Sequence, residues 1–266
     1  MWVTMCEMIC SRHVLGAQQK MWVAVLAMKG GEDPHNFSRR RDIWLLSHMV
    51  HLIDHMLMEE HQRLERHWGV RSQAGFSKGR GCPEVSLTSR LVKEMSHREQ
   101  RDLYKTYIDF ALFFMSVDKG GVRELEDKLG MTRLCSKALD HMGLNLTGRY
   151  DTTHGMTDLT SNGAEMGQGR VTSPERAKIV IATIARAVNK VIAGYQVWGG
   201  TRIPQMWFAD DGSFNTEDDF VTQLLLEVVW WVAYIMGMDV GVKGLSKTVV
   251  HGRIWVLWVN GVATPV

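Results

Sequence analysis

The sequence predicts an α+β fold in which helices pack on one antiparallel sheet. Segments with apolar residues at helical spacing are mixed with short segments of strand-forming residues, without a regular alternation of strand and helix. Glycines fall in short clusters that mark turns, not in long linkers. With 266 residues, of which 45% are hydrophobic and 23% charged, the chain can form one folded unit with sub-domains.

The first half of the chain predicts helices followed by a strand. Residues 41–67 carry apolar side chains at helical spacing, which predicts one or two helices. Glycines and a proline in residues 72–83 interrupt this pattern, and a further helix is predicted over residues 84–97. Residues 103–110 favour a strand because aromatic and β-branched residues are frequent there, and Asp109 lies near its end.

The second half begins with a predicted helix over residues 122–129, which ends at the glycine that follows. Residues 144–167 are polar and glycine-rich, which predicts a loop or hairpin. The clearest helix start is Ser-Pro-Glu at residues 173–175. It offers a capping hydroxyl, a proline at the first helical position and an acid at the positive helix end. We expect this helix to end at Gly194.

Two short strands, residues 205–209 and 212–215, predict a β-hairpin with Asp210 and Asp211 at its tip. Adjacent carboxylates repel each other and are costly to ionise, and a divalent cation would remove that cost. Mg²⁺ prefers such oxygen ligands, and a pair of ions can stabilise both oxygens of a phosphoryl displacement. Asp109 is the best candidate for a third carboxylate. On spacing alone, the commoner explanation of such a pair is a solvated turn.

A long apolar segment follows the hairpin. Thr216 and Asp219 have the spacing of a capping box and predict the start of the next helix. Residues 220–238 approach the length of a membrane span, but they contain Gln223 and Glu227. We therefore expect a buried helix and no membrane segment.

Charge and cysteine content exclude some classes of protein. A net charge of +2 argues against a histone-like binder, but not against an enzyme that holds nucleic acid in one basic groove. Basic residues cluster at residues 39–41 and at Lys78 with Arg80. The four cysteines lack paired spacing, which indicates neither a zinc site nor a disulfide framework, and residues 1–30 lack a signal-peptide layout. An intracellular location fits best, and both nucleus and cytoplasm remain open.

Several segments match, in order, the motifs of one enzyme family. They are Gln-Ala-Gly-Phe-Ser-Lys-Gly-Arg at residues 73–80, Tyr-Ile-Asp at 107–109 with Phe114 and Ser116-Val117 beyond it, Gln-Gly-Arg-Val-Thr-Ser-Pro at 168–174, Phe-Ala-Asp-Asp at 208–211, and residues 237–248 ending in Lys247-Thr248. Lys29-Gly30 with residues 41–46 adds a match from which Asp42 and Trp44 depart. Together these segments resemble the reverse transcriptases of non-LTR, LINE-like retroelements over residues 22–250.

This resemblance implies the fingers and palm of a right-hand polymerase, in which an antiparallel palm sheet packs on helices. It implies RNA-directed DNA synthesis, in which dNTPs extend a primer on an RNA or DNA template by two-metal nucleotidyl transfer. Asp109, Asp210 and Asp211 would be catalytic and would bind Mg²⁺, or Mn²⁺ in its place. Nucleotide binding would fall to Lys78, Arg80, Phe114, Gln168, Gly169 and Lys247. No membrane partner is implied, and the oligomeric state stays open.

The resemblance also divides the chain into regions. Residues 1–21 would be an N-terminal extension, residues 22–105 the fingers and residues 106–250 the palm. A fingers-like insertion would occupy residues 130–165 of the palm. Residues 251–266 would be the start of a truncated thumb, as in a fragment of a larger polyprotein.

Two other interpretations of the residues stand beside the polymerase. Leu112 and Met115 replace the Lys and Asp that many relatives carry after the first catalytic Asp. The alternative is therefore a catalytically inactive retroelement remnant that binds nucleic acid or a protein partner. His48, His51 and His55 could share one helix face and bind zinc, although no fourth ligand is evident.

Overall fold

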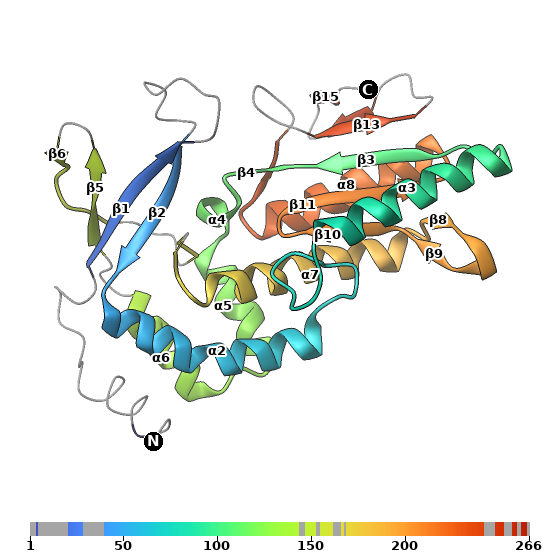
Figure 1. The fold of residues 1–266 in the computed structure, drawn as a ribbon. Coiled ribbons are helices and arrows are strands. Elements are labelled where there is room, and N and C mark those ends of the chain that lie inside the picture. Colours follow the sequence, from blue (N-terminus) through green and yellow to red (C-terminus); the bar gives the residue numbers. More distant parts are fainter. Residues whose placement is uncertain are drawn as a thin grey trace. The chain divides into compact units, whose positions relative to one another are not determined.

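The computed structural model describes residues 4, 21–28, 40–143, 147–152, 155–161, 166–167, 169–241, 248–252, 257–259 and 262–264 (Figure 1). The chain divides into two compact units, each built from two stretches of sequence. The first unit comprises residues 1–66 and 122–176, and the second comprises residues 67–121 and 177–266. Both units combine helices with sheets in which most strand pairs are antiparallel, which confirms the predicted α+β class.

The sheet of the first unit has the strand order β2-β1-β5-β6, and β7 also pairs with β5 (Figure 1). The strands are β1 (Met21–Met28), β2 (Arg40–Leu46), β5 (Thr147–Thr152), β6 (Gly155–Met156) and β7 (Thr160–Ser161). Strand β1 runs antiparallel to β2 and parallel to β5. The hairpin expected within residues 144–167 is therefore present as β5 and β6.

The helix predicted over residues 41–67 is wrong for its first six residues, which belong to β2. In this stretch Trp44 and Leu46 are buried, whereas Ile43 and Leu45 are 43% and 55% exposed. This alternation is typical of a strand with one face on the core. The run of four apolar residues fits a helix pattern equally well in sequence, and pairing with β1 decides the outcome.

The helices of the first unit are α2 (His48–Trp68), α5 (Lys119–Lys128) and α6 (Arg133–Gly143). By their residue ranges, α2 and α5 extend into the second unit. Helix α2 buries one apolar stripe formed by Val50, Ile53, Leu57 and Leu64. Helix α5 starts earlier than predicted but ends as expected before Gly130, whose φ of 86° is left-handed.

Two tryptophans form the centre of the first sheet. The indole rings of Trp22 and Trp44 are buried and stacked, with centroids 4.7 Å apart and planes inclined by 6°. Gly148 faces Trp22, and Gly167 faces Trp44, so closely that a Cβ on either glycine would overlap an indole ring. Glycine is therefore required at both positions to admit the paired rings.

The second unit is built on a four-stranded antiparallel sheet with the order β10-β11-β3-β13 (Figure 1). Its strands are β3 (Tyr104–Ile108), β10 (Gln205–Phe208), β11 (Asp211–Thr216) and β13 (Val249–His251). The predicted strand near residues 103–110 and the predicted hairpin near residue 210 are both confirmed. Trp207 and Phe214 pack edge to face across the hairpin, with ring centroids 5.2 Å apart, and both are fully buried.

Shorter elements complete the second unit. They are β4 (Phe110–Ala111) paired with β12 (Asp239–Val240), β8 (Tyr195–Gln196) paired with β9 (Arg202–Ile203), β14 (Leu257–Val259) paired with β15 (Val262–Thr264), the one-turn helix α4 (Phe113–Ser116) and the 3-10 turn η3 (Trp198–Gly200).

Three longer helices follow the predictions, with two corrections at their starts. They are α3 (Cys82–Glu99), α7 (Ser173–Val191) and α8 (Asp219–Ile235). The backbone N–H of Arg176 donates to Thr172 O, so Thr172, and not Ser173, takes the cap position of α7. The cap of α8 is Asp218, whose carboxylate accepts from the Val221 N–H at 2.7 Å, whereas the predicted cap Thr216 belongs to β11.

Helix α8 is buried on one face only, which corrects the expectation of a buried helix. Leu225 and Val229 are inaccessible, whereas Phe220, Tyr234 and Ile235 are 75%, 63% and 70% exposed. Among the described helices, none is both long enough and apolar enough to cross a membrane.

Candidate functional site

The three predicted carboxylate residues lie at one end of neighbouring strands. Asp109 directly follows Ile108, the last residue of β3, and Asp211 directly precedes Gly212. Ile108 and Gly212 are partners in the antiparallel register of β3 and β11. The backbone therefore brings Asp109 to the end of the sheet where the β10–β11 turn carries Asp210 and Asp211.

The Gln73 side chain fixes the turn that carries this acid pair. Its Nε2 donates to Ala209 O at 2.9 Å, and its Oε1 accepts from the Ala209 N–H at 3.0 Å. Ala209 has a φ of 56°, which is rare for a residue with a Cβ. Gln73 is buried, so its amide satisfies both backbone groups of a residue in a strained conformation, directly before Asp210.

The same segment is joined to β10 by backbone bonds. The Ala74 N–H donates to Trp207 O at 2.8 Å, and the Trp207 N–H donates to Ser72 O at 2.8 Å. Gly75 then passes so close to Ala209 that a Cβ would overlap the Ala209 backbone nitrogen. The Gln-x-Gly part of the first motif is therefore packed directly against the Phe-Ala-Asp-Asp turn.

Thr248 and Gly241 hold the backbone of Asp109. Its Oγ1 accepts from the Asp109 N–H at 3.1 Å, and the Gly241 N–H donates to Asp109 O at 2.9 Å. Thr248 is the last residue of the predicted Lys-Thr motif and precedes β13, which pairs with β3. Two motifs distant in sequence thus fix the backbone at the two places that carry the aspartates.

Phe114 and the two departures lie in a short apolar turn after Asp109. Leu112 has a φ of 51° and is 70% exposed, while Phe113 is buried. Phe114 and Met115 are half-buried within the one-turn helix α4. The apolar stretch after Asp109 therefore exposes Leu112 and buries Phe113.

Carboxylate oxygens suit hard cations such as Mg²⁺, Mn²⁺ and Ca²⁺, so the donor set fits the predicted ion. Within the described residues, no three His, Cys, Asp or Glu side chains are grouped closely enough to hold a metal ion by themselves. Magnesium is often held by one or two carboxylates together with substrate phosphates. A site of that kind does not require such a group. The proposed zinc histidines, His48, His51 and His55, form no such group either.

The predicted nucleotide-binding residues are only partly described. Gln168 and Lys247 lie outside the described residues. Lys78 and Arg80 are exposed, and the Arg80 guanidinium donates to Arg71 O and lies 3.9 Å from Glu84. Arg80 lines a cleft whose lining includes none of the three aspartates.

Gly169 belongs to a loop that is built around Trp44. Its φ of 121° is accessible to glycine alone, and a Cβ there would overlap the carbonyl oxygen of Trp44. The Ser173 hydroxyl donates to Gly167 O at 3.0 Å, which closes the loop at the start of α7. Trp44, a departure from the family pattern, is therefore a packing surface for the Gln-Gly motif.

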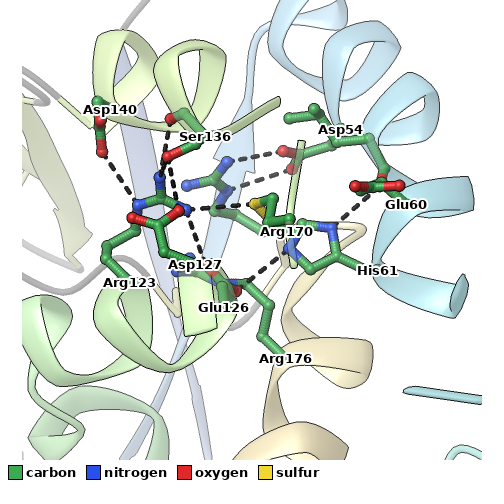
Figure 2. A network of polar contacts seen from close by, with 12 residues as sticks. Asp54, Glu60, His61, Arg123, Glu126, Asp127, Ser136, Asp140, Arg170 and Arg176 are labelled. Atoms are coloured by element: carbon green, nitrogen blue, oxygen red, sulfur yellow. Dashed lines mark hydrogen bonds and ion pairs between the residues drawn. The ribbon is translucent and has the colours of Figure 1, made fainter. Parts of the chain in front are cut away.

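A buried ion pair anchors the same loop to α2 (Figure 2). Arg170 Nη2 lies 2.7 Å from Asp54 Oδ1, and Arg170 Nε lies 3.2 Å from Asp54 Oδ2, a bidentate arrangement. Both side chains are almost inaccessible to solvent. The loop that contains Gly169 is thus tied at Arg170 to the core of the first unit.

Glu126 is the centre of a second buried ion cluster in the first unit (Figure 2). It accepts from Arg176 Nε at 2.6 Å, from Arg123 Nη1 at 2.8 Å, and interacts with His61 Nε2 at 3.3 Å. Burial would raise the pKa of Glu126, but Arg176 and His61 outweigh burial and hold the pKa well below its usual range. The start of α7 is therefore fixed to α5 and α2 by a charged carboxylate.

The chain matches no known protein family by sequence, and no curated protein sequence matches it. Solved structures do match it. Apo telomerase from Candida tropicalis, truncated from its C-terminal domain, superposes with a TM-score of 0.57 at 13% identity, covering 88% of this chain and 52% of that one. The fold is that of a reverse-transcriptase-like polymerase.

A second structure agrees. Telomerase from Candida albicans, in complex with a three-way-junction (TWJ) fragment of telomeric RNA, superposes with a TM-score of 0.60 at 10% identity, covering 98% of this chain and 48% of that one. The chain thus spans about half the length of both telomerase chains. At these identities the likeness concerns the fold.

Sequence reasoning missed several residues that position this site. Gln73 and Thr248 lie within quoted motifs, so their place in the motifs was the available signal. The buried ion pairs of the first unit carried no signal, because Arg170 lies 116 residues from Asp54 and Arg176 lies 50 residues from Glu126.

Proposed function

We propose that this chain is the fingers and palm of an RNA-directed DNA polymerase related to non-LTR reverse transcriptases. The observation that carries the proposal is the backbone register that brings Asp109, Asp210 and Asp211 to one end of the β3–β11 pair, within a reverse-transcriptase-like fold. The RNA bound to the Candida albicans telomerase supports a nucleic-acid partner. Primer, template and dNTPs would be the substrates.

The chemistry asks mainly for positioning and charge neutralisation. Phosphoryl transfer passes through a loose transition state with negative charge spread over the transferred group. Mg²⁺ held by the aspartates would neutralise that charge and orient the reacting oxygens. The chain's own contribution is to hold the Asp109 backbone through Thr248 and the residue before Asp210 through Gln73.

The test is primer extension on oligo(rA)/oligo(dT) with Mg²⁺, comparing wild type, Asp210→Asn and the control Asp102→Asn. Asp102 is an exposed aspartate that precedes β3 in the same unit. Loss of a metal contact removes several kcal/mol of transition-state stabilisation, so extension by Asp210→Asn should fall at least about a hundredfold. Asp102→Asn should extend like wild type. Equal extension by all three proteins would refute the role of Asp210.

An inactive remnant that binds nucleic acid is the second candidate. Exposed Leu112, with a left-handed backbone just beyond Asp109, favours it because relatives place a polar residue there. The two candidates separate in one pair of measurements. A remnant would bind primer-template without extending it, and Mg²⁺ would not raise its melting temperature, because no metal site would favour the folded state.

A further inference from the structure

The second unit contains a cleft of about 720 Å³ whose lining does not include the aspartates. It is enclosed by the segment before Gly75, by α3, by the end of α7 and by the residues that lead from β9 into β10. Its volume lies within the range of ligand pockets, which is roughly 300–1,000 Å³. The cleft is therefore large enough for a phosphate-bearing ligand.

Four arginines converge on this cleft from separate parts of the chain: Arg71, Arg80, Arg186 and Arg202. Among its described lining residues the only acid is Glu84, 3.9 Å from Arg80. Clustered positive charge in a concave surface concentrates anions. Such an excess is costly in a folded protein unless an anion compensates it.

The arginine heads are positioned by backbone carbonyls. Arg186 Nε donates to Trp68 O at 2.7 Å, and its guanidinium lies 4.2 Å from the centre of the Trp68 ring. Arg202 Nη1 donates to Gly194 O at 2.8 Å. A carbonyl uses one or two of the five guanidinium N–H groups and leaves the positive charge in place. These bonds hold the guanidinium groups in fixed directions without neutralising them, although Arg202 Nη1 also lies 3.9 Å from Glu217, which partly compensates its charge.

The rest of the lining suits a sugar or base. Ile192, Pro204 and Met206 contribute apolar surface beside the arginines, and Asn189 adds an amide. Apolar surface next to fixed guanidinium groups is the combination used to bind nucleic-acid strands, whose phosphates and bases alternate. A solvated basic face would need neither the concavity nor the apolar wall.

We propose that this cleft binds the phosphate groups of a nucleic-acid strand or of a nucleoside triphosphate. The identity of the ligand rests on the proposed function, whereas binding at the cleft is independent of catalysis. Arg80, which the family resemblance assigns to the nucleotide, acts here as one wall of a separate basic site. An anion held here would neutralise the guanidinium excess that the fold leaves uncompensated.

The test measures binding of a fluorescent single-stranded oligonucleotide by anisotropy in EDTA, so that no metal-dependent step takes part. The variant is Arg71→Gln with Arg202→Gln, because both residues are exposed and their loss leaves the core intact. Arg71→Gln alone is a milder second variant. Arg90→Gln, an exposed arginine on α3 outside the cleft, is the matched control. Asp210→Asn is included to separate this site from the aspartates.

The double variant should bind about tenfold more weakly than wild type, since each charged contact is worth roughly a factor of three at an exposed site. The slope of log affinity against log salt concentration should become shallower by about 1.4 in the double variant. Each lost phosphate contact reduces the size of this slope by roughly 0.7 for single strands. Arg90→Gln and Asp210→Asn should bind like wild type. If wild type binds the oligonucleotide but does not extend a primer, weakened binding by the double variant would still support this site although the chain is not a polymerase.

A parallel titration with dATP, followed by thermal shift, distinguishes the two sources of phosphate. Weakened strand binding with unchanged dATP binding assigns the cleft to a strand, and the opposite result assigns it to a free nucleotide. Unchanged affinity for both ligands in the double variant overturns the proposal. Equal weakening in Arg90→Gln also overturns it, because the effect would then reflect net charge and not the cleft.

Discussion

Replacing Glu126 by Gln should destabilise the first unit strongly, because it removes one charge from the centre of a buried cluster (Figure 2). Glutamine keeps the size of the side chain but is neutral. The Arg176 guanidinium, at 2.6 Å and 3.2 Å from the two carboxylate oxygens, would face an amide that carries donors of its own. Arg123 would lose its ion pair with Glu126 at 2.8 Å and keep the one with Asp140 at 3.0 Å. Breaking a buried ion pair on one side costs about 3–5 kcal/mol.

That magnitude is a large part of the free energy of unfolding of a domain, which is typically about 5–15 kcal/mol. The assay is equilibrium unfolding in urea followed by circular dichroism. The matched control is Glu124→Gln on the same helix, because Glu124 is exposed and pairs with nearby Lys128 at 2.6 Å. The control should unfold at a midpoint close to that of wild type.

The effect of Glu126 should also depend on pH with a defined sign. The pKa of its carboxyl group is lower in the folded chain than the ordinary value of 4.5. Its stabilising contribution is therefore complete above the ordinary value and is lost as pH falls through the folded pKa. The difference between wild type and Glu126→Gln should shrink below about pH 4. A difference under about 1 kcal/mol at neutral pH, or one that grows in acid, would refute a charged Glu126 as the centre of this cluster.

Three further predictions concern single residues. Burial lowers the pKa of Lys105 to about 8. Between that pH and the ordinary value of 10.5, the unfolded chain keeps a proton that the folded chain has lost, so the free energy of unfolding should rise with pH. Thermal unfolding of Lys105→Met should lack this rise. Gly167→Ala would place a methyl group in the ring of Trp44 and should lower the free energy of unfolding in urea by about 1–3 kcal/mol; an unchanged midpoint would show that the ring can move aside. Gln73→Leu would leave the backbone N–H and C=O of Ala209 without their amide partner. Primer extension should therefore fall at least about tenfold, while oligonucleotide binding stays unchanged. Unaltered extension would contradict the positioning role of Gln73.

The sequence was most informative where local chemistry decides the structure. The hairpin around Asp210 follows from short strand segments on both sides of an acid pair. Helix α7 ends at Val191, three residues before the predicted stop at the left-handed Gly194. The first residues of β2 could not be assigned in this way. Ile43 and Leu45 fit a helix as well as a strand, and only pairing with residues 12 to 24 positions earlier in β1 separates the two.

The residues of the candidate site also fall into those that local sequence indicates and those that it does not. Asp109 and the acid pair could be chosen as candidates from sequence because their segments resemble family motifs, and the register of β3 and β11 brings their backbones to one end of the two strands. The side chains that support the site could not, because their bonds join distant segments. Asp54 pairs with Arg170 across 116 residues of sequence. Charged residues are rarely buried, so a lone Asp or Arg in the sequence is expected at the surface. Trp44 departs from the family motif, and its packing against Gly167 and Gly169 explains why a tryptophan fits there.

The bonds of Thr248, Gly241 and Gln73 at the two acid-bearing turns are made to backbone atoms. Thr248 and Gly241 bond to the N–H and C=O of Asp109, and Gln73 bonds to the N–H and C=O of Ala209. Changing Asp210 to Asn leaves all of these bonds in place. Loss of extension in that variant therefore reports on the chemistry of the carboxylate, whereas loss in Gln73→Leu reports on its position.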